Sequence, residues 1–193
     1  MNYWKKVRKI IRGSNVVLEV LDARFAREMR NKDLEQSCVR ADKKIMIVVN
    51  KTDLISKTSA QKIWREFSAD YPTVMVSTRN RKGKNILKKF VGTASKKKQA
   101  IVSVVGYPNT GKSSLINYLK GKKSARTSIT AGFTRGEQFF RISDHVLLID
   151  TPGVLPFFRG GESKLALLSA KTPQALKDPV ESAQKILMEL KYR

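Results

Sequence analysis

The sequence predicts an α/β fold with a doubly wound, mainly parallel six-stranded sheet and one antiparallel edge strand. Five short apolar runs rich in β-branched residues recur along the chain, and a helix-compatible stretch follows each of the first four. Runs of this kind are typical of parallel strands that helices cover on both faces. The five runs are 16–21, 45–49, 74–76, 101–105 and 146–149.

The antiparallel edge strand follows from a predicted hairpin. Ser143 and Asp144 lie between the strand-like runs 138–142 and 145–149, and a polar pair between two such runs indicates a turn. Apolar residues at helical spacing predict the helices between the strands. These helices are expected at 31–40, 59–69, 84–95 and 112–119.

Both ends of the chain predict further helices. Residues 1–13 mix apolar and basic side chains in an amphipathic pattern. Near the other end, Asp178 can cap a helix that begins at Pro179 and carries Glu181 in its first turn. We expect the buried side of this last helix to carry Val180, Ala183, Leu187 and Leu190.

The composition indicates a polyanionic partner. The chain has 193 residues, 41% of them hydrophobic, which is enough for one core, and a formal net charge of +23. Residues 71–136 contain 15 Lys and Arg and no Asp or Glu, so no acid within this stretch neutralises them. Nucleic acid or an acidic membrane surface fits such an excess, and the alternative is a solvated basic face.

The same composition excludes several classes of protein. Cys38 is the single cysteine, which rules out an internal disulfide framework and a zinc module. No segment contains the ~20 apolar residues that cross a bilayer, so we expect a cytoplasmic chain without stable membrane association. His145 falls at the predicted hairpin turn and is expected to be a surface residue.

Residues 106–113 carry the strongest chemical signal, the Walker A pattern G-Y-P-N-T-G-K-S. Its glycines let backbone N–H groups surround a phosphate, Lys112 can reach the β- and γ-phosphate oxygens, and Ser113 can hold Mg²⁺. A strand before the pattern and a helix after it favour this interpretation over a glycine-rich surface turn. The expected phosphate-binding residues are Asn109, Thr110, Gly111, Lys112, Ser113 and Ser114.

A second motif, N-K-T-D at 50–53, follows directly on the run 45–49. The carboxylate of Asp53 can accept from guanine N1–H and the 2-amino group, whereas adenine has an acceptor at N1 and lacks that amino group. The stem of Lys51 can cover the ring, and Asn50 can contact the base and brace the loop. Taken alone, the four residues could equally form a solvated turn.

The third motif is D-T-P-G at 150–153, after the run 146–149. Asp150 stands where a Walker B aspartate holds the water shell of magnesium, and the backbone N–H of Gly153 can meet a γ-phosphate. By itself D-T-P-G is also an ordinary turn. Three such motifs at three strand ends together favour a nucleoside triphosphate site.

The order of these motifs resembles the circularly permuted GTPases, in particular the YlqF/YawG branch of RbgA-like ribosome-assembly GTPases. An ordinary GTPase places its phosphate loop before N-K-x-D, whereas here 50–53 precede 106–113. The D-A-R signature at 22–24 agrees with this branch. The resemblance implies a GTPase domain at 1–160 and a short helical extension at 161–193, in place of the further helical domain that relatives usually carry.

The resemblance also implies further site residues. Ser77 and Thr78 look like the family's second base-contacting loop. Residues 132–135 match its switch I, so Thr134 would be a second hydroxyl ligand of Mg²⁺, together with Ser113 and Asp150. Asn109 occupies the position that ligates K⁺ in potassium-dependent relatives, and the alternative is that it only braces the loop.

Hydrolysis is expected to be slow. Val154 stands where many GTPases place a water-orienting glutamine, and its side chain cannot hydrogen-bond a water. An external group, from RNA, protein or K⁺, is expected to complete a catalytic set of Lys112, Asn109, Thr134 and Gly153. Because the chain runs from Gly153 directly into 154–193, rearrangement at the γ-phosphate is expected to reach the last helix.

The predicted function is that of a monomeric GTPase that uses GTP and GDP, Mg²⁺ and K⁺. The resemblance implies a role in ribosome assembly, of the large subunit, through nucleotide-gated binding of ribosomal RNA. Two other functions stay open. One is a P-loop kinase or ATPase in which N-K-T-D is only a turn, and the other is a non-enzymatic, GTP-dependent RNA-binding switch.

Overall fold

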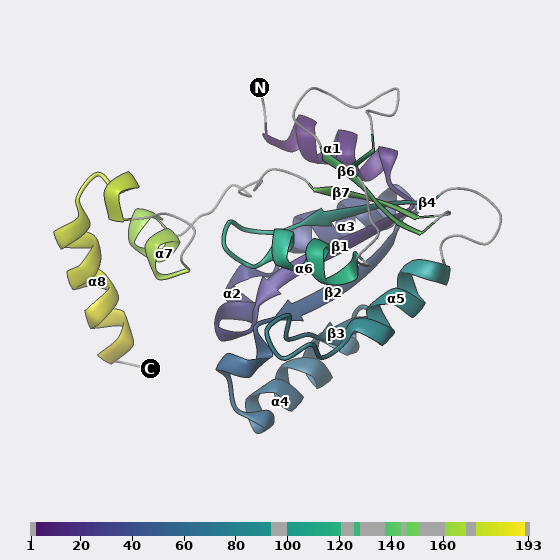
Figure 1. Cartoon of the computed structure of the whole chain (residues 1–193). Coiled ribbons are helices and arrows are strands. Elements are labelled where there is room, and N and C mark those ends of the chain that lie inside the picture. Colours follow the sequence, from purple (N-terminus) through teal and green to yellow (C-terminus); the bar gives the residue numbers. More distant parts are fainter. Residues whose placement is uncertain are drawn as a thin grey trace.

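A single sheet forms the centre of the molecule (Figure 1). The computed structural model describes residues 3–93, 100–120, 126–127, 138–143, 146–150, 161–168 and 173–191. The strand order is β3-β2-β1-β4-β7-β6-β5. The strands are β1 (Val16–Asp22), β2 (Lys44–Asn50), β3 (Thr73–Met75), β4 (Ala100–Val105), β5 (Arg126–Thr127), β6 (Gln138–Ser143) and β7 (Val146–Asp150).

The pairing confirms the mainly parallel, doubly wound sheet. Strands β3, β2, β1, β4 and β7 are parallel neighbours, and β6 runs antiparallel to β7 as the hairpin prediction requires. The sheet has seven strands where six were expected, because the two-residue β5 pairs with β6 and becomes the edge. The hairpin turn with His145 lies outside the described residues.

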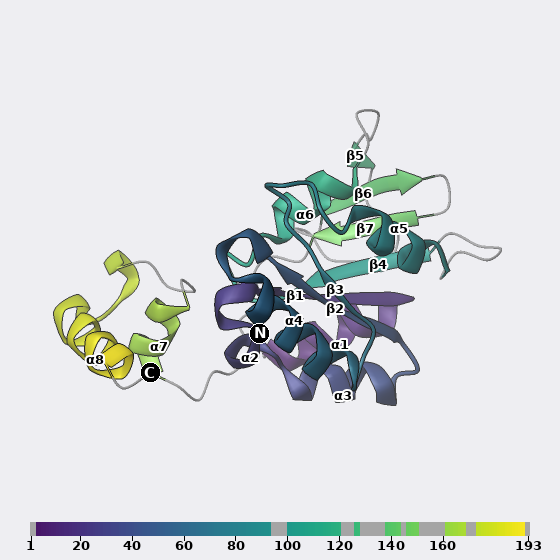
Figure 2. The same ribbon diagram turned by 90° about the horizontal axis from the view of Figure 1, so that it is seen from below.

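Two layers of helices cover the sheet (Figure 2). Alternate residues of β1 point to opposite faces, so Val16, Leu18 and Val20 pack with one layer while Val17 and Leu21 pack with the other. We call these the α5–α6 layer and the α1–α4 layer. The helices are α1 (Tyr3–Gly13), α2 (Ala26–Met29), α3 (Lys32–Arg40), α4 (Lys57–Ser68), α5 (Lys84–Thr93) and α6 (Lys112–Leu119).

The C-terminal helices are α7 (Gly161–Leu167) and α8 (Pro179–Lys191). The predicted cap of α8 is present, because Asp178 accepts a hydrogen bond of 2.9 Å from the backbone N–H of Glu181. The expectation about its buried side was wrong for three residues, since Val180 and Leu187 are 69% and 66% exposed and Ala183 is exposed too, while the side chain of Leu190 lies outside the described residues. The helix packs against α7, and the described residues that it turns inward are Ser182 and Ile186.

No described helix combines the length and the apolar character that crossing a membrane requires.

Candidate nucleotide-binding site

All the candidate motifs follow the carboxyl ends of parallel strands, and these ends share one edge of the sheet. Asp22 and Asn50 stand opposite each other at the ends of β1 and β2, and Asp150 ends β7 opposite Val104 of β4. The chain winds from β1 toward β3 on one side and from β4 toward β7 on the other. The winding direction therefore reverses between β1 and β4, where ligands of open α/β sheets bind.

The Walker A loop follows β4 and requires both of its flanking glycines. Gly106 has a φ of +147°, and a Cβ there would lie 2.3 Å from the carbonyl oxygen of Val20. Gly111 has a φ of +92°, and its Cβ would lie 2.4 Å from the side-chain nitrogen of Asn50. Any larger residue would force the loop away from β1 or away from the N-K-T-D segment.

Lys112 lies across the loop that it belongs to. This nearly buried side chain donates hydrogen bonds of 3.0 and 2.7 Å to the carbonyl oxygens of Gly106 and Tyr107. Helix α6 begins at Lys112, so the backbone N–H groups of its first turn, with Ser113 and Ser114, belong to the same loop region. A cation and a helix N-terminus at one loop are what a phosphate group requires.

The N-K-T-D segment is hydrogen-bonded to the Walker A loop across the end of β1. Asn50 donates a 3.0 Å hydrogen bond to the carbonyl oxygen of Thr110, and Lys51 donates one of 2.6 Å to that of Asn109. Lys51 itself adopts a left-handed backbone with a φ of +61°. The solvated-turn alternative predicts no such contacts, and these bonds hold the two motifs side by side.

Asp22 holds this connection in place. It is 2% exposed and forms ion pairs of 2.7 Å with Lys51 and 2.8 Å with Arg24. Burial raises the pKa of the Asp22 carboxyl, but hydrogen bonds from Arg24 and Lys51 outweigh burial and lower this pKa below its ordinary value. The sequence offered Asp22 only as part of the D-A-R signature. The signal for its role was a carboxylate at the end of a central strand.

Asp53 is oriented by the loop after β3. Ser77 is buried and donates a 2.6 Å hydrogen bond to a carboxylate oxygen of Asp53, and it accepts one of 3.0 Å from the backbone N–H of Asn80. The bond from Ser77 lowers the pKa of Asp53, which favours the ionised, accepting form. Thr78 follows Ser77 directly, so the two predicted base-contacting segments lie together.

The magnesium and hydrolysis residues are only partly described. Ser113 lies in the first turn of α6, and the backbone of Asp150 ends β7 beside the strand that leads into the Walker A loop. Thr134, Gly153 and Val154 lie outside the described residues. In the part of the chain that the structure describes, no three His, Cys, Asp or Glu side chains gather into a possible metal site.

Asn109 is exposed and adopts a left-handed backbone with a φ of +61°. Asparagine tolerates this conformation better than most residues. Its carbonyl oxygen accepts the bond from Lys51, so its backbone contributes to the connection between the two loops. Ligation of K⁺ by its side chain stays a prediction.

Comparisons with known proteins also indicate a GTP-binding domain. Residues 101–189 match the family described as 50S ribosome-binding GTPase. An uncharacterized GTP-binding protein of Methanocaldococcus jannaschii is 41% identical over 189 residues, covering 96% of this chain and 50% of the relative. Human guanine nucleotide-binding protein-like 3 is 31% identical over 221 residues, covering 99% and 40%.

A third relative is nucleolar GTP-binding protein 2 of Schizosaccharomyces pombe, 36% identical over 162 residues, with 79% of this chain and 30% of the relative covered. The chain thus spans half or less of the length of these relatives.

Proposed function

We propose that this chain, which carries a P-loop GTPase domain homologous to nucleolar GTP-binding proteins, binds GTP and GDP and hydrolyses GTP slowly. The observation that carries the proposal is the pair of hydrogen bonds from Asn50 and Lys51 to the Walker A loop. They hold the segment that carries Asp53 against the Walker A loop, so that one nucleotide can contact both.

Each part of the nucleotide has its residues in this proposal. Asn50, Lys51 and Asp53 hold the guanine base, with Ser77 and Thr78 closing the site around it. The phosphates lie in the Walker A loop against Lys112. Magnesium, which neutralises charge between the β- and γ-phosphates, would be held by Ser113, Thr134 and Asp150, and the N–H of Gly153 would sense the γ-phosphate.

Base selectivity tests the proposal. Asp53→Asn should lower GDP affinity about tenfold to a hundredfold, because the new amide accepts from only one guanine donor, and should raise affinity for xanthosine diphosphate. Titration with fluorescent GDP, ADP and xanthosine diphosphate measures this. Asp33→Asn, an equal change on the exposed side of α3, is the control. Unchanged GDP affinity, or ADP affinity that equals GDP affinity in the parent chain, would favour the kinase or ATPase alternative.

Slow turnover is the second part of the proposal. Val154 cannot orient a water, so ribosomal particles should raise kcat rather than lower KM, because the missing group acts in the transition state. K⁺ should stimulate more than Na⁺, and Asn109→Ala should abolish that difference while Val154→Gln rescues little. Turnover that ribosomes leave unchanged would favour the non-enzymatic switch. Fast basal turnover that is indifferent to the cation would leave Asn109 a loop brace.

The proposed biological role is ribosome assembly, as a monomeric member of the circularly permuted YlqF/YawG branch. Two observations support this: the motif order, and a family match that begins at residue 101, after N-K-T-D. We place the chain in the cytoplasm or wherever its cell assembles ribosomes, with ribosomal RNA of the large subunit as partner. Co-sedimentation with each subunit, in GDP and in a non-hydrolysable GTP analogue, tests the partner and the nucleotide gating.

A further inference from the structure

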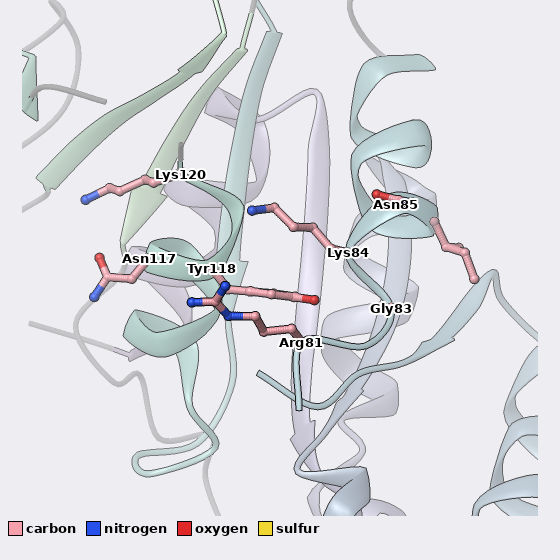
Figure 3. A pocket seen from close by; sticks show the side chains of 8 residues that line it. Arg81, Gly83, Lys84, Asn85, Asn117, Tyr118 and Lys120 are labelled. Atoms are coloured by element: carbon pink, nitrogen blue, oxygen red, sulfur yellow. The ribbon is translucent and has the colours of Figure 1, made fainter. Parts of the chain in front are cut away.

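A pocket of about 750 Å³ lies between the start of α5 and the end of α6 (Figure 3). Its described lining brings together the basic side chains of Arg81, Lys84 and Lys120, the amides of Asn85 and Asn117, and the ring of Tyr118. In Figure 3, Arg81 and Lys84 reach from the α5 side toward α6. The pocket uses none of the residues that were placed at the base or the phosphates.

The lining is cationic without compensating acids. Residues 71–136 contain no Asp or Glu, and Arg81 and Lys84 form no ion pair with any residue that the structure describes. Lys120 is a third cation of the lining, and its ammonium lies 3.2 Å from the centre of the Phe140 ring. Two cations of this pocket are therefore available to an anionic ligand.

The local backbone fixes where Arg81 and Lys84 leave the chain. The loop that carries Arg81 is closed by backbone hydrogen bonds of 3.3 and 3.0 Å between Ser77 and Lys82. Gly83 then turns with a φ of +85°, where a Cβ would lie 2.5 Å from the carbonyl oxygen of Met75. The Lys84 ammonium lies 5.0 Å from the centre of the Tyr118 ring. Because the backbone and the Lys84 ammonium are held in place, a ligand loses less entropy in ordering them.

The hydroxyl of Tyr118 adds an independent observation. This oxygen is buried and has no hydrogen-bond partner among the described residues. A buried hydroxyl without a partner costs free energy that a ligand acceptor can recover. A phosphate oxygen is a strong acceptor, and the two neighbouring cations favour it.

We propose that this pocket binds a phosphodiester of single-stranded RNA, with Arg81, Lys84 and the Tyr118 hydroxyl on the phosphate and one of the lining amides beside the adjoining base. The proposal rests on the proposed role in RNA binding and names the site. A membrane surface fits less well, since a recessed pocket with side-chain amides suits a base edge. Proteins recognise such edges in unpaired strands rather than in duplex RNA.

The test is fluorescence anisotropy with a labelled 12-nucleotide single-stranded RNA and a duplex of the same length, using the full chain at several KCl concentrations. Arg81→Gln with Lys84→Gln should weaken single-strand binding at least tenfold and reduce the slope of log K against log salt by about 1.4, since each contact to a single strand contributes about 0.7. Tyr118→Phe should weaken binding about threefold to tenfold and leave the slope unchanged.

The matched control is Lys88→Gln with Lys89→Gln, which removes the same charge from α5 outside the pocket lining. It should weaken binding less than threefold. The proposal would be overturned if both double variants lost RNA affinity equally, or if Tyr118→Phe bound RNA as the parent does. It would also be overturned if the variants lost affinity for duplex and single-stranded RNA equally. Each result would leave only a general basic surface.

Fluorescent GDP, titrated into each variant, separates this proposal from the proposed function. Unchanged GDP affinity together with lost RNA binding supports the pocket. A parallel loss of GDP affinity would assign the pocket to the nucleotide site and overturn the proposal. Failure of the parent chain to bind GDP would refute the proposed function, while the RNA titrations would still test the pocket.

Discussion

The α1–α4 layer and the α5–α6 layer differ in whether their charged side chains form ion pairs. In the α1–α4 layer, Arg27 pairs with Glu66, and Arg30 pairs with both Glu35 and Asp70. On the other side, the loop before α5 and α5 itself carry six cations without an ion pair to any described residue. One layer uses its charges to hold the fold, and the other keeps them available for a partner.

Arg30 is the centre of the paired layer. It is 9% exposed, donates hydrogen bonds of 2.6 and 3.0 Å to Glu35, and lies over the ring of Phe67 at 5.0 Å. The carboxylate of Glu19 is also buried on this side. Hydrogen bonding to Glu35 outweighs burial and raises the pKa of Arg30. This layer therefore depends on its cation for stability.

The largest effect is expected from removing that cation. Arg30→Met should lower the free energy of unfolding by about 3–5 kcal/mol, because it leaves Glu35 buried without a partner. Urea unfolding measures this. Arg27→Met breaks an exposed pair, whose partners are 56% and 45% exposed, and should cost less than about 1 kcal/mol. Equal costs for the two variants would contradict the distinction between the layers.

The next largest effect is expected at Asp22, which ends β1 between the two layers and forms an ion pair with Lys51. Asp22→Asn should lower GDP affinity about tenfold, because Lys51 loses its charged partner and the Walker A loop loses a fixed contact. Fluorescent-GDP titration measures the change. Arg24→Ala leaves the Lys51 pair intact and should change affinity less. A greater loss in Arg24→Ala would show that the arginine is the functional partner of Asp22.

A smaller effect should appear as a dependence on pH. Burial, and then repulsion by Glu35, hold the pKa of Glu19 well above its ordinary 4.5. The folded chain therefore binds a proton that the unfolded chain releases, so this contribution to stability is full below pH 4.5 and is lost as the pH rises through the folded pKa. Glu19→Gln should therefore gain stability relative to the parent as the pH rises from 4 to 8. If the free energy of unfolding of the variant and of the parent changed with pH in parallel, this prediction would be refuted.

The smallest effect on stability is expected from the acid-free stretch. Changing Lys96, Lys97 and Lys98 to Gln should leave the free energy of unfolding within about 0.5 kcal/mol of the parent. It should still reduce the slope of log K for RNA binding against log salt by about 2. Unfolding and anisotropy measurements on the same variant check both expectations. An unchanged slope would show that these three lysines do not contact RNA phosphates.

Much of the fold could be predicted because strands buried on both faces leave a continuous apolar pattern. The inward side of α8 could not be predicted: periodicity grouped Val180 and Leu187 on one face, but did not reveal that this face is exposed and that Ser182 is buried instead. Segments such as α2 are too short to show a helical period. The site residues were readable as motifs, while the role of Asp22 depends on the register that places it beside Asn50.

The position of β1 between β2 and β4 has a consequence for synthesis. Residues 3–93 leave the ribosome before β4 does, and these contain the N-K-T-D segment, five helices and one completed edge of β1. The other edge of β1 keeps its backbone groups unpaired until β4 emerges, so for that interval it can pair with another nascent chain. The hydrogen bonds from Asn50 and Lys51 form only after Thr110 has been made. These bonds therefore form only in a chain that has been synthesised beyond β4, in which both edges of β1 are paired.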